Sequence, residues 1–389
     1  MGNQNTIQNS PEGQTEQKQT ITTASPFQDL TDSYTALAKL EKPKQSQNIS
    51  ILSPFQNVKD LPTPLSLSQC VLHKHEILIC GGVDKRDCYS YHTIKDEYKF
   101  ICEYPSNVRL SGHCVIKLVD NNSSKNKDSN EITLLSFGGN TYTRHTLVMN
   151  YVSVWNDDDE MNKSKQSNNC NQWFPLTDSS NYPIHIGRSN DNHCGVRALI
   201  GGSNNHLLFI AYEPKKISVF NLNTLEFISD DILPTMDKVW YHCFVPKSEN
   251  EIKKKNNEML LFYQNTGLSI EYDEKNDVFQ FHKIAVCDDI ASFYKYAYVY
   301  TNDAILFFGG YGWNGRKYTV SKAVHKYLIQ ENKWITFELT LPIPLRDCFG
   351  ILNQETSQIH IIGGCNDKIV PVSTHMKTKV SAWRDASHL

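Results

Sequence analysis

An all-β fold made of repeated antiparallel sheets is predicted for this chain of 389 residues by two observations. Short apolar runs rich in aromatic and β-branched residues recur along the chain, and a glycine pair ends several of them. Runs of this length and composition favour strands over helices. A pair of aromatic residues seven positions apart follows most of the runs, so one unit of strand, turn, strand and aromatic strand repeats.

Six copies of this unit follow one another in the chain. Their apolar runs are Glu76–Gly82, Ile132–Gly139, His206–Tyr212, Met259–Asn265, Ala304–Gly310 and Ile359–Gly364. The third and fourth runs keep the strand but lack the glycine pair. The clearest aromatic pairs are Tyr91 with Tyr98, Phe220 with Phe227, Tyr272 with Phe279, and Tyr327 with Trp334. The copies are spaced near the ~50 residues that one sheet-forming repeat of this kind occupies.

These repeats resemble the kelch-repeat family over roughly residues 50–389. The resemblance implies a six-bladed kelch-type β-propeller with four-stranded antiparallel blades. A single blade cannot bury both of its faces, so it needs a neighbour on each side, and closure into a ring supplies one for every blade. The repeated aromatic residues are therefore expected to pack between blades.

Composition argues against several classes of function. The formal net charge of −3 gives no basic footprint for nucleic acid. No apolar run approaches the ~18 residues of a membrane helix, and the start of the chain lacks the apolar core of a secretory signal. The eleven cysteines are odd in number and follow the repeats. This pattern predicts reduced thiols in the cytoplasm rather than a disulfide framework.

Residues 1–49 are predicted to be a disordered low-complexity tail, because they are polar and lack periodicity. The first six residues, MGNQNT, fit the pattern for N-myristoylation of Gly2, and an ordinary disordered terminus is the alternative. A single acyl chain binds a membrane only marginally, so any membrane association through Gly2 is expected to be reversible.

The tetrapeptide SPFQ occurs twice, at Ser25–Gln28 and at Ser53–Gln56. The second copy continues into Val58–Leu65, which resembles the link between the last two units. A strand near residues 54–60 is therefore predicted to complete the last blade and to leave no open edge. The alternative is that Trp383–Leu389 supplies this strand. The first SPFQ copy is interpreted as linker.

One face of the predicted propeller would be formed by the loops after the second strand of each blade and by the links between blades. These segments carry Tyr, Trp and Arg, the residue types that dominate protein–protein hot spots. Kelch propellers that recruit proteins or peptides commonly use this face, so the resemblance implies the same surface. The candidate partner-binding residues are Arg86, Tyr142, Arg144, His145, Tyr311, Trp313, Arg316, Tyr318 and Asp367. The alternative is that these loops are merely polar and that Tyr142 or Trp313 packs between blades.

The first strands carry His113, His193 and His242, each directly before a cysteine. In a propeller such strands line a central channel, where imidazoles and thiols could bind zinc or copper. Neighbouring residues on a strand point to opposite sides, so no metal site is predicted. The chain also lacks a phosphate-binding loop, a nucleophile elbow and a zinc-binding helix motif. We therefore expect no cofactor and no enzyme activity.

The sequence thus predicts a non-catalytic scaffold that binds partner proteins or peptides through the loop face of a propeller. The expected absence of a BTB-like or F-box-like stretch before the repeats separates it from the ubiquitin adaptors of the family. The alternative function is a small-molecule enzyme, of the oxidase or sugar-epimerase type, with its site at the mouth of the channel.

Overall fold

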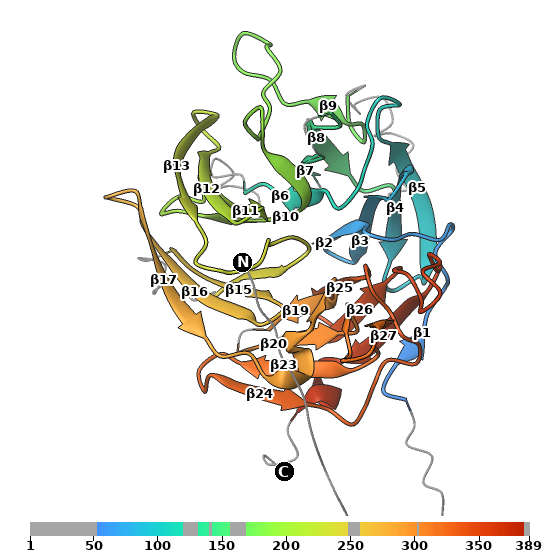
Figure 1. Cartoon of the computed structure of the whole chain (residues 1–389). Coiled ribbons are helices and arrows are strands. Elements are labelled where there is room, and N and C mark those ends of the chain that lie inside the picture. The colour runs from blue at the N-terminus through green and yellow to red at the C-terminus, as the bar shows by residue number, and fades with distance from the viewer. Residues whose placement is uncertain are drawn as a thin grey trace, which may run out of the picture. The chain divides into compact units, whose positions relative to one another are not determined.

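Figure 1 shows the protein as a computed structural model, which describes residues 53–119, 131–139, 142–155, 169–247, 257–301 and 303–384. Within these ranges the strands form six four-stranded sheets and one three-stranded sheet. Neighbouring strands in every sheet run antiparallel. The predicted all-β fold of four-stranded antiparallel sheets is thereby confirmed. The tail predicted over residues 1–49, with Gly2, lies outside the described residues.

Each of the first four sheets is built from four consecutive strands. The first sheet contains β2 (Gln69–His73), β3 (Glu76–Gly82), β4 (Lys85–His92) and β5 (Glu97–Glu103). The second contains β6 (Cys114–Lys117), β7 (Glu131–Gly138), β8 (His145–Val152) and β9 (Phe174–Pro175). The third contains β10 (Asn192–Gly201), β11 (Leu207–Glu213), β12 (Lys216–Asn221) and β13 (Glu226–Ile232). The fourth contains β14 (Cys243–Pro246), β15 (Asn257–Tyr263), β16 (Thr266–Asp273) and β17 (Val278–Ile284).

The fifth sheet is interrupted by the three-stranded sheet. It contains β19 (Ala297–Tyr300), β20 (Ala304–Phe308), β23 (Val324–Leu328) and β24 (Lys333–Thr336). The three-stranded sheet contains β18 (Phe293–Tyr294), β21 (Tyr311–Trp313) and β22 (Tyr318–Val320). A short helix, α1 (Asp288–Ala291), precedes it. Among the described residues, no helix is long and apolar enough to cross a membrane.

The sixth sheet combines strands from both ends of the described chain. It contains β25 (Phe349–Asn353), β26 (Gln358–Ile362), β27 (His375–Lys379) and β1 (Gln56–Asn57). β1 pairs with the outer edge of β27. After β27 the chain forms the 3-10 helix η2 (Val380–Trp383), and residues 385–389 lie outside the described part.

Burial differs between the inner and outer strands of each sheet. Every residue of β3 and of β20 is buried, because these apolar runs are covered on both faces. The outer strand β13 alternates between half-buried and exposed residues instead. The apolar runs therefore lie inside their sheets. Exposed strands such as β13 form the outer edge, whereas first strands such as β2 and β14 form a mostly buried edge.

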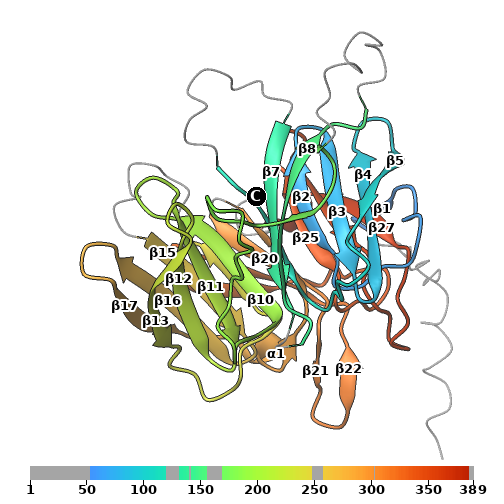
Figure 2. The same cartoon turned by 90° about the horizontal axis from the view of Figure 1, so that it is seen from above.

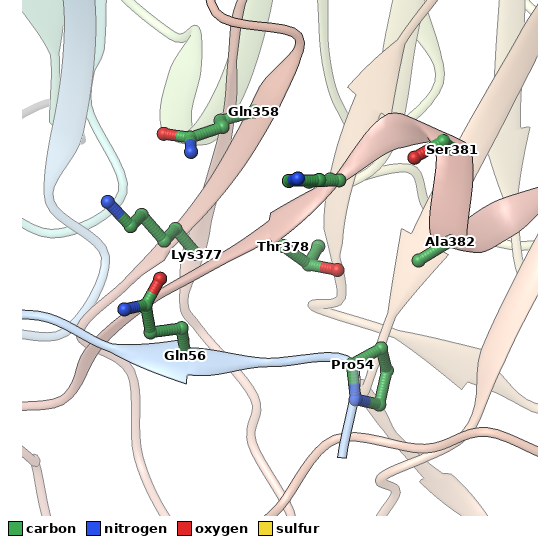
Figure 3. A pocket seen from close by; sticks show the side chains of 8 residues that line it. Pro54, Gln56, Gln358, Lys377, Thr378, Ser381 and Ala382 are labelled. Carbon is green, nitrogen blue, oxygen red and sulfur yellow. The ribbon is translucent and has the colours of Figure 1, made fainter. Parts of the chain in front are cut away.

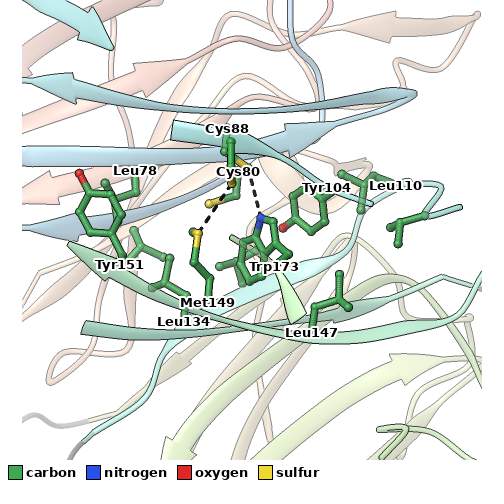
Figure 4. Close-up of a cluster of buried hydrophobic side chains, with 14 of the residues drawn as sticks. Leu78, Cys80, Cys88, Tyr104, Leu110, Leu134, Leu147, Met149, Tyr151 and Trp173 are labelled. Atoms are coloured by element: carbon green, nitrogen blue, oxygen red, sulfur yellow. Dashed lines mark hydrogen bonds between the residues drawn. The ribbon is translucent and has the colours of Figure 1, made fainter. Parts of the chain in front are cut away.

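Six clusters of buried side chains join the sheets in succession. The first lies between the first and second sheets, where Trp173 stacks on Tyr104 with ring centroids 4.7 Å apart (Figure 4). Four further clusters join each following pair of sheets. The sixth contains Leu65 and Ile79 together with Ile362, so the sixth sheet packs against the first. Apolar area removed from water at such contacts contributes about 25 cal/mol per Å2 to folding.

Backbone hydrogen bonds connect the starts of the first strands of several neighbouring sheets. In each four-stranded sheet, one residue near the start of the first strand has a left-handed φ of +51° to +75°. It lies two positions before the residue at which the regular antiparallel pairing of that strand begins. These residues are Leu67, Gly112, Gly195, Tyr241, Lys295 and Asp347. The N–H groups of Gly195, Tyr241 and Asp347 each donate to the carbonyl of the preceding member at 2.8 Å, and the N–H of Leu67 donates to the carbonyl of Asp347 at 2.8 Å. Non-glycine residues held in this conformation cost about 1–3 kcal/mol and often mark functional sites.

Gly363 shows why a glycine pair ends the second strand. Its φ is +61°, and an added Cβ would lie 2.5 Å from the carbonyl oxygen of Leu65. That oxygen accepts a hydrogen bond from the N–H of Gly364 at 2.8 Å. The glycine pair thus lets the backbone of the next link approach closely.

We expect Gly363→Ala to lower the free energy of unfolding by about 2–4 kcal/mol, because the new methyl group must displace a hydrogen-bonded backbone. Gly315→Ala is the matched control. Gly315 also has a positive φ, +88°, but no atom lies within 4 Å of its added Cβ. Its replacement should cost only about 1 kcal/mol of conformational strain. Urea unfolding of both variants tests this, and equal losses would refute the steric explanation.

Candidate partner-binding surface

The hairpin β21–β22 projects from the fifth sheet. Figure 2 shows the two strands extending away from the neighbouring sheets. Its turn is fixed by Asn314, whose Oδ1 accepts hydrogen bonds from the N–H groups of Arg316 at 3.1 Å and Lys317 at 3.0 Å. Gly315 supplies the left-handed residue that this turn needs. The hairpin base is held by β18, which pairs with β21.

Aromatic rings continue from the hairpin to the link before the fourth sheet. We define the aromatic platform as Trp240, Tyr294, Tyr311, Trp313 and Tyr318. Tyr311 stacks on Tyr318 at 5.4 Å between centroids, and Trp313 meets Tyr318 edge-on at 5.3 Å. Tyr294 contacts Tyr311 at 5.9 Å and stacks with Trp240 at 6.4 Å. Trp313 and Tyr318 remain 48% and 59% exposed, so the platform ends in two accessible rings.

Two cations and one carboxylate lie beneath this platform. The guanidinium of Arg346 lies 4.5 Å from the ring centroid of Tyr311, a cation–π distance. Asp347 is buried and lies 3.5 Å from Arg346 Nε and 3.4 Å from Lys295 Nζ. Burial raises the pKa of the Asp347 carboxyl, and the charges of Lys295 and Arg346 oppose that shift. The cations therefore hold Tyr311 and the link before the sixth sheet in one arrangement.

The sequence-predicted residues are only partly brought together. Tyr311, Trp313 and Tyr318 share the platform, and Arg316 is exposed at its tip. Asp367 is exposed in the loop after β26 of the sixth sheet.

Two other predicted residues hold local structure. Arg86 donates to Glu103 Oε2 at 2.9 Å within the first sheet. Arg144 donates to the carbonyls of Gly187 and Arg188, at 3.0 and 2.6 Å. Both guanidinium groups are therefore already engaged within the protein.

The loop before β8 gives a mixed result. Tyr142 is 94% exposed, whereas His145 is only 5% exposed. The His145 ring lies 3.2 Å from Ser136 Oγ, and burial lowers its pKa to about 4. His145 is thus a buried neutral side chain and does not belong to the candidate partner-binding surface.

The histidines of the first strands are also buried and separate. His113 and His242 are fully buried, and His193 is 1% exposed. Burial lowers the pKa of His113 to about 3 and that of His193 to about 4, so both are neutral at pH 7. Among the described residues, no group of three or more His, Cys, Asp or Glu could hold a metal ion.

Sequence reasoning missed the support of the platform. Trp240, Tyr294, Lys295, Arg346 and Asp347 were not among the candidates. A signal was present, because aromatic or charged pairs directly precede the innermost strands of the fourth, fifth and sixth sheets. Their contact with the hairpin could not be read from spacing, since it depends on the pairing of β18 with β21.

No family model matches the chain. No curated protein matches its sequence. Among solved structures, that of YjhT is similar, with a TM-score of 0.59 and 12% sequence identity over 84% of this chain and 98% of that chain. A likeness at this level of identity concerns the fold alone.

Proposed function

We propose that the six sheets are the blades of one closed, kelch-type β-propeller. Two observations support this proposal. The packing order of the sheets returns from the sixth to the first through the cluster around Leu65 and Ile362. The N–H of Leu67, before the first sheet, donates to the carbonyl of Asp347, before the sixth. In a closed arrangement each sheet covers the next, so every apolar sheet face is buried and no end sheet is left uncovered.

We propose further that the protein is a non-catalytic scaffold that binds a partner protein or peptide through the aromatic platform. The exposure of Trp313 and Tyr318 on a hairpin that is braced from below carries this proposal. Rigid aromatic side chains offer a large contact area with little loss of conformational entropy on binding. The exposed cations Arg316 and Lys317 at the tip favour acidic groups next to the apolar contact. The cytoplasm, where the buried thiols of Cys80 and Cys243 stay reduced, is the proposed compartment.

The double change W313A/Y318A tests this function. We expect it to weaken partner binding at least about 100-fold, because truncation of a hot-spot aromatic typically costs 2 kcal/mol or more. The melting temperature should change little, since both side chains are about half exposed. Affinity capture from the native cell, quantified by mass spectrometry, identifies the proteins lost with this variant, and titration with the purified partner gives the affinity.

Y182A is the matched control, because Tyr182 is an exposed ring (71%) outside the platform. It should retain every partner that W313A/Y318A loses. If both variants capture the same proteins as the unchanged chain, the platform is not the binding surface.

A further inference from the structure

The edge of the sixth sheet is covered by a very short strand. β1 pairs with β27 over two residues, with Gln56 opposite Lys377 and Asn57 opposite Met376. Beside this pairing, a cleft of about 300 Å3 is lined by Pro54, Gln56, Lys377 and Thr378, together with residues of η2 (Figure 3). So short a ladder contributes few hydrogen bonds, and edge segments of this kind open at much lower cost than the whole fold. The N-terminal segment that contains β1 is therefore held mainly by contacts of the residues before and after the two paired positions.

Phe55 is the first of these anchors. Its ring lies 5.5 Å from that of Trp383 and 6.1 Å from that of Phe308, measured between centroids. The hydroxyl of Ser53 accepts a hydrogen bond from the N–H of Phe55 at 3.3 Å. Within SPFQ, Phe55 thus packs against two aromatic rings, Ser53 makes a local hydrogen bond, and Gln56 forms one of the two residue pairs with β27.

Apolar residues after the ladder supply the other anchors. The N–H of Val58 donates to the carbonyl of His375 at 3.1 Å, and the N–H of Leu61 donates to that of Ser373 at 2.8 Å. Leu61 and Leu65 are 4% and 0% exposed. The whole segment 53–65 therefore follows the outer edge of the sixth sheet towards the first.

The tail contains a second copy of this whole segment, not only of SPFQ. Residues 25–37 and 53–65 align without a gap and are identical at seven of thirteen positions. The identical residues are Ser25, Pro26, Phe27, Gln28, Asp32, Thr35 and Leu37, which correspond to Ser53, Pro54, Phe55, Gln56, Asp60, Thr63 and Leu65. A four-residue match arises easily by chance in a chain of this length. A match that continues in register through a buried anchor nine residues further on does not.

The shared positions are those that hold the segment at the edge. Phe27 would take the place of Phe55, and Leu37 that of the fully buried Leu65. Leu30 aligns with Val58, so a branched apolar side chain is kept there too. Lys59, which aligns with Thr31, contacts the first sheet through its backbone N–H and carbonyl, and these contacts do not need the lysine side chain.

The differences make the tail copy the weaker of the two. Ser33 aligns with the buried Leu61, so one apolar anchor is lost. Tyr34 and Ala36 align with Pro62 and Pro64. Because proline restricts the backbone, a sequence without these two prolines loses more conformational entropy when it binds in one conformation. The segment 53–65 should therefore be the majority occupant of the edge, as the structure has it.

We propose that the outer edge of β27 is a binding site for extended SPFQ-type segments, and that residues 25–37 of the same chain exchange with residues 53–65 at this site. The exchange keeps the register, so that Gln28 comes opposite Lys377. The anchors and backbone acceptors on β27 are the same for both occupants. Residues 38–65 are long enough to let residue 37 take the place of residue 65 while residue 66 keeps its position, and the entropic cost of closing a loop rises only slowly with its length.

Disulfide trapping in the full-length chain tests this exchange. Q56C/K377C reports the majority arrangement, because the two positions are Cα partners. Q28C/K377C reports the exchanged one. Q47C/K377C is the matched control, since residue 47 lies closer along the chain to the edge than residue 28 but has no place in the aligned segment. The products are read by peptide mapping and on non-reducing gels.

We expect Q28C/K377C to cross-link at least about three-fold more than Q47C/K377C, and the yield to rise further when Phe55→Ala weakens the resident segment. The product should be monomeric. If Q47C/K377C cross-links as well as Q28C/K377C, the tail is merely near the edge and the proposal fails. A disulfide-linked dimer would also overturn it, because the occupant would then be a second copy of the chain.

A stability cycle gives an independent readout that needs no cysteine. F27A alone should leave the melting temperature unchanged, because segment 53–65 occupies the edge. In the F55A background, F27A should lower the melting temperature further, since Phe27 is then the phenylalanine that packs against Trp383. Such coupling arises only between residues that share a partner or site. If F27A has no effect in either background, Phe27 does not take the place of Phe55 and the proposal fails.

Discussion

Lowering the pH from about 7 to about 5 is expected to unfold this protein, because seven histidines are buried as neutral rings. Burial lowers the pKa of His113 to about 3 and that of His145, His193, His325 and His360 to about 4. Burial also lowers the pKa of His242 and of His375 well below the usual value. Each ring is therefore neutral in the folded protein at pH values where the unfolded chain is already protonated.

The direction of the effect follows from proton binding. Between the unfolded pKa of about 6.5 and the folded values near 4, the unfolded state binds more protons than the folded state. Stability is thus fully present above about pH 6.5 and falls as the pH decreases through this window. Each histidine removes about 1.4 kcal/mol per pH unit. Seven together remove on the order of 10 kcal/mol per unit, comparable with the whole stability of a typical domain.

Two of these histidines lie where the sixth sheet meets the first. His360 Nδ1 lies 2.9 Å from His375 Nε2, and the His375 ring packs edge-on against Tyr91 at 4.5 Å between centroids. Tyr98 contacts His375 Nδ1 through its hydroxyl. A proton added to this pair would place a charge in the contact between the two sheets. We expect this contact to be among the first to open in acid.

The measurement is circular dichroism and tryptophan fluorescence between about pH 8 and about pH 4, with urea unfolding at each pH. The variant H193F/H242F removes two of the neutral rings in aromatic surroundings. It should reduce the slope of stability against pH by about 2.7 kcal/mol per unit. A flat stability curve down to about pH 4.5, or an unchanged slope in this variant, would contradict the explanation.

Trp383→Ala is expected to lower the free energy of unfolding by about 3–5 kcal/mol, the usual cost of removing a large buried aromatic. Trp383 is 1% exposed. Its ring lies within 5.3–5.6 Å of the rings of Phe55, Phe308 and Phe337, between centroids. These rings come from the N-terminal segment, β20 and the chain after β24, so one side chain fills the space between three separate parts of the chain. The melting temperature should fall by roughly 5–10 °C.

Trp313→Ala is the control for that experiment, because it removes the same side chain from a position that is 48% exposed. Its cost should stay below about 1 kcal/mol. Trp383→Phe should recover part of the loss by refilling the cavity. Equal melting temperatures for Trp383→Ala and Trp313→Ala would show that the packing around Trp383 contributes little to stability.

Local sequence predicted the sheets because their signals are local. Runs such as Ala304–Gly310 carry both the strand and the glycine pair that follows it, and the described strands coincide with them. The alignment of the first strands was less accurate. Cys114 and Cys243 each lie two residues after the left-handed residue that precedes the strand. In the first and third sheets that position is held by Gln69 and Arg197, not by Cys70 and Cys194. The cysteines of the first strands therefore do not share one structural position, and Cys194 is only half-buried.

The exposed half of the candidate surface was predictable, and its support was not. Tyr, Trp and Arg in the loop Tyr311–Tyr318 indicated a contact surface, since these residue types dominate protein–protein hot spots. His145 was wrongly grouped with them, because burial is not visible in a loop sequence. The support from Trp240 and Arg346 arises from residues that lie far from the hairpin in the chain.

The amino-acid sequence by itself determined the all-β class, the succession of four-stranded sheets and the glycine turns, because each depends on residues within one strand or one turn of each other. Only the tertiary structure decided that Tyr294 and Arg346 brace the platform, that His145 is buried, and that Phe55 packs against Trp383. Those contacts join segments tens to hundreds of residues apart, and their geometry is fixed by how whole sheets pack rather than by any local pattern.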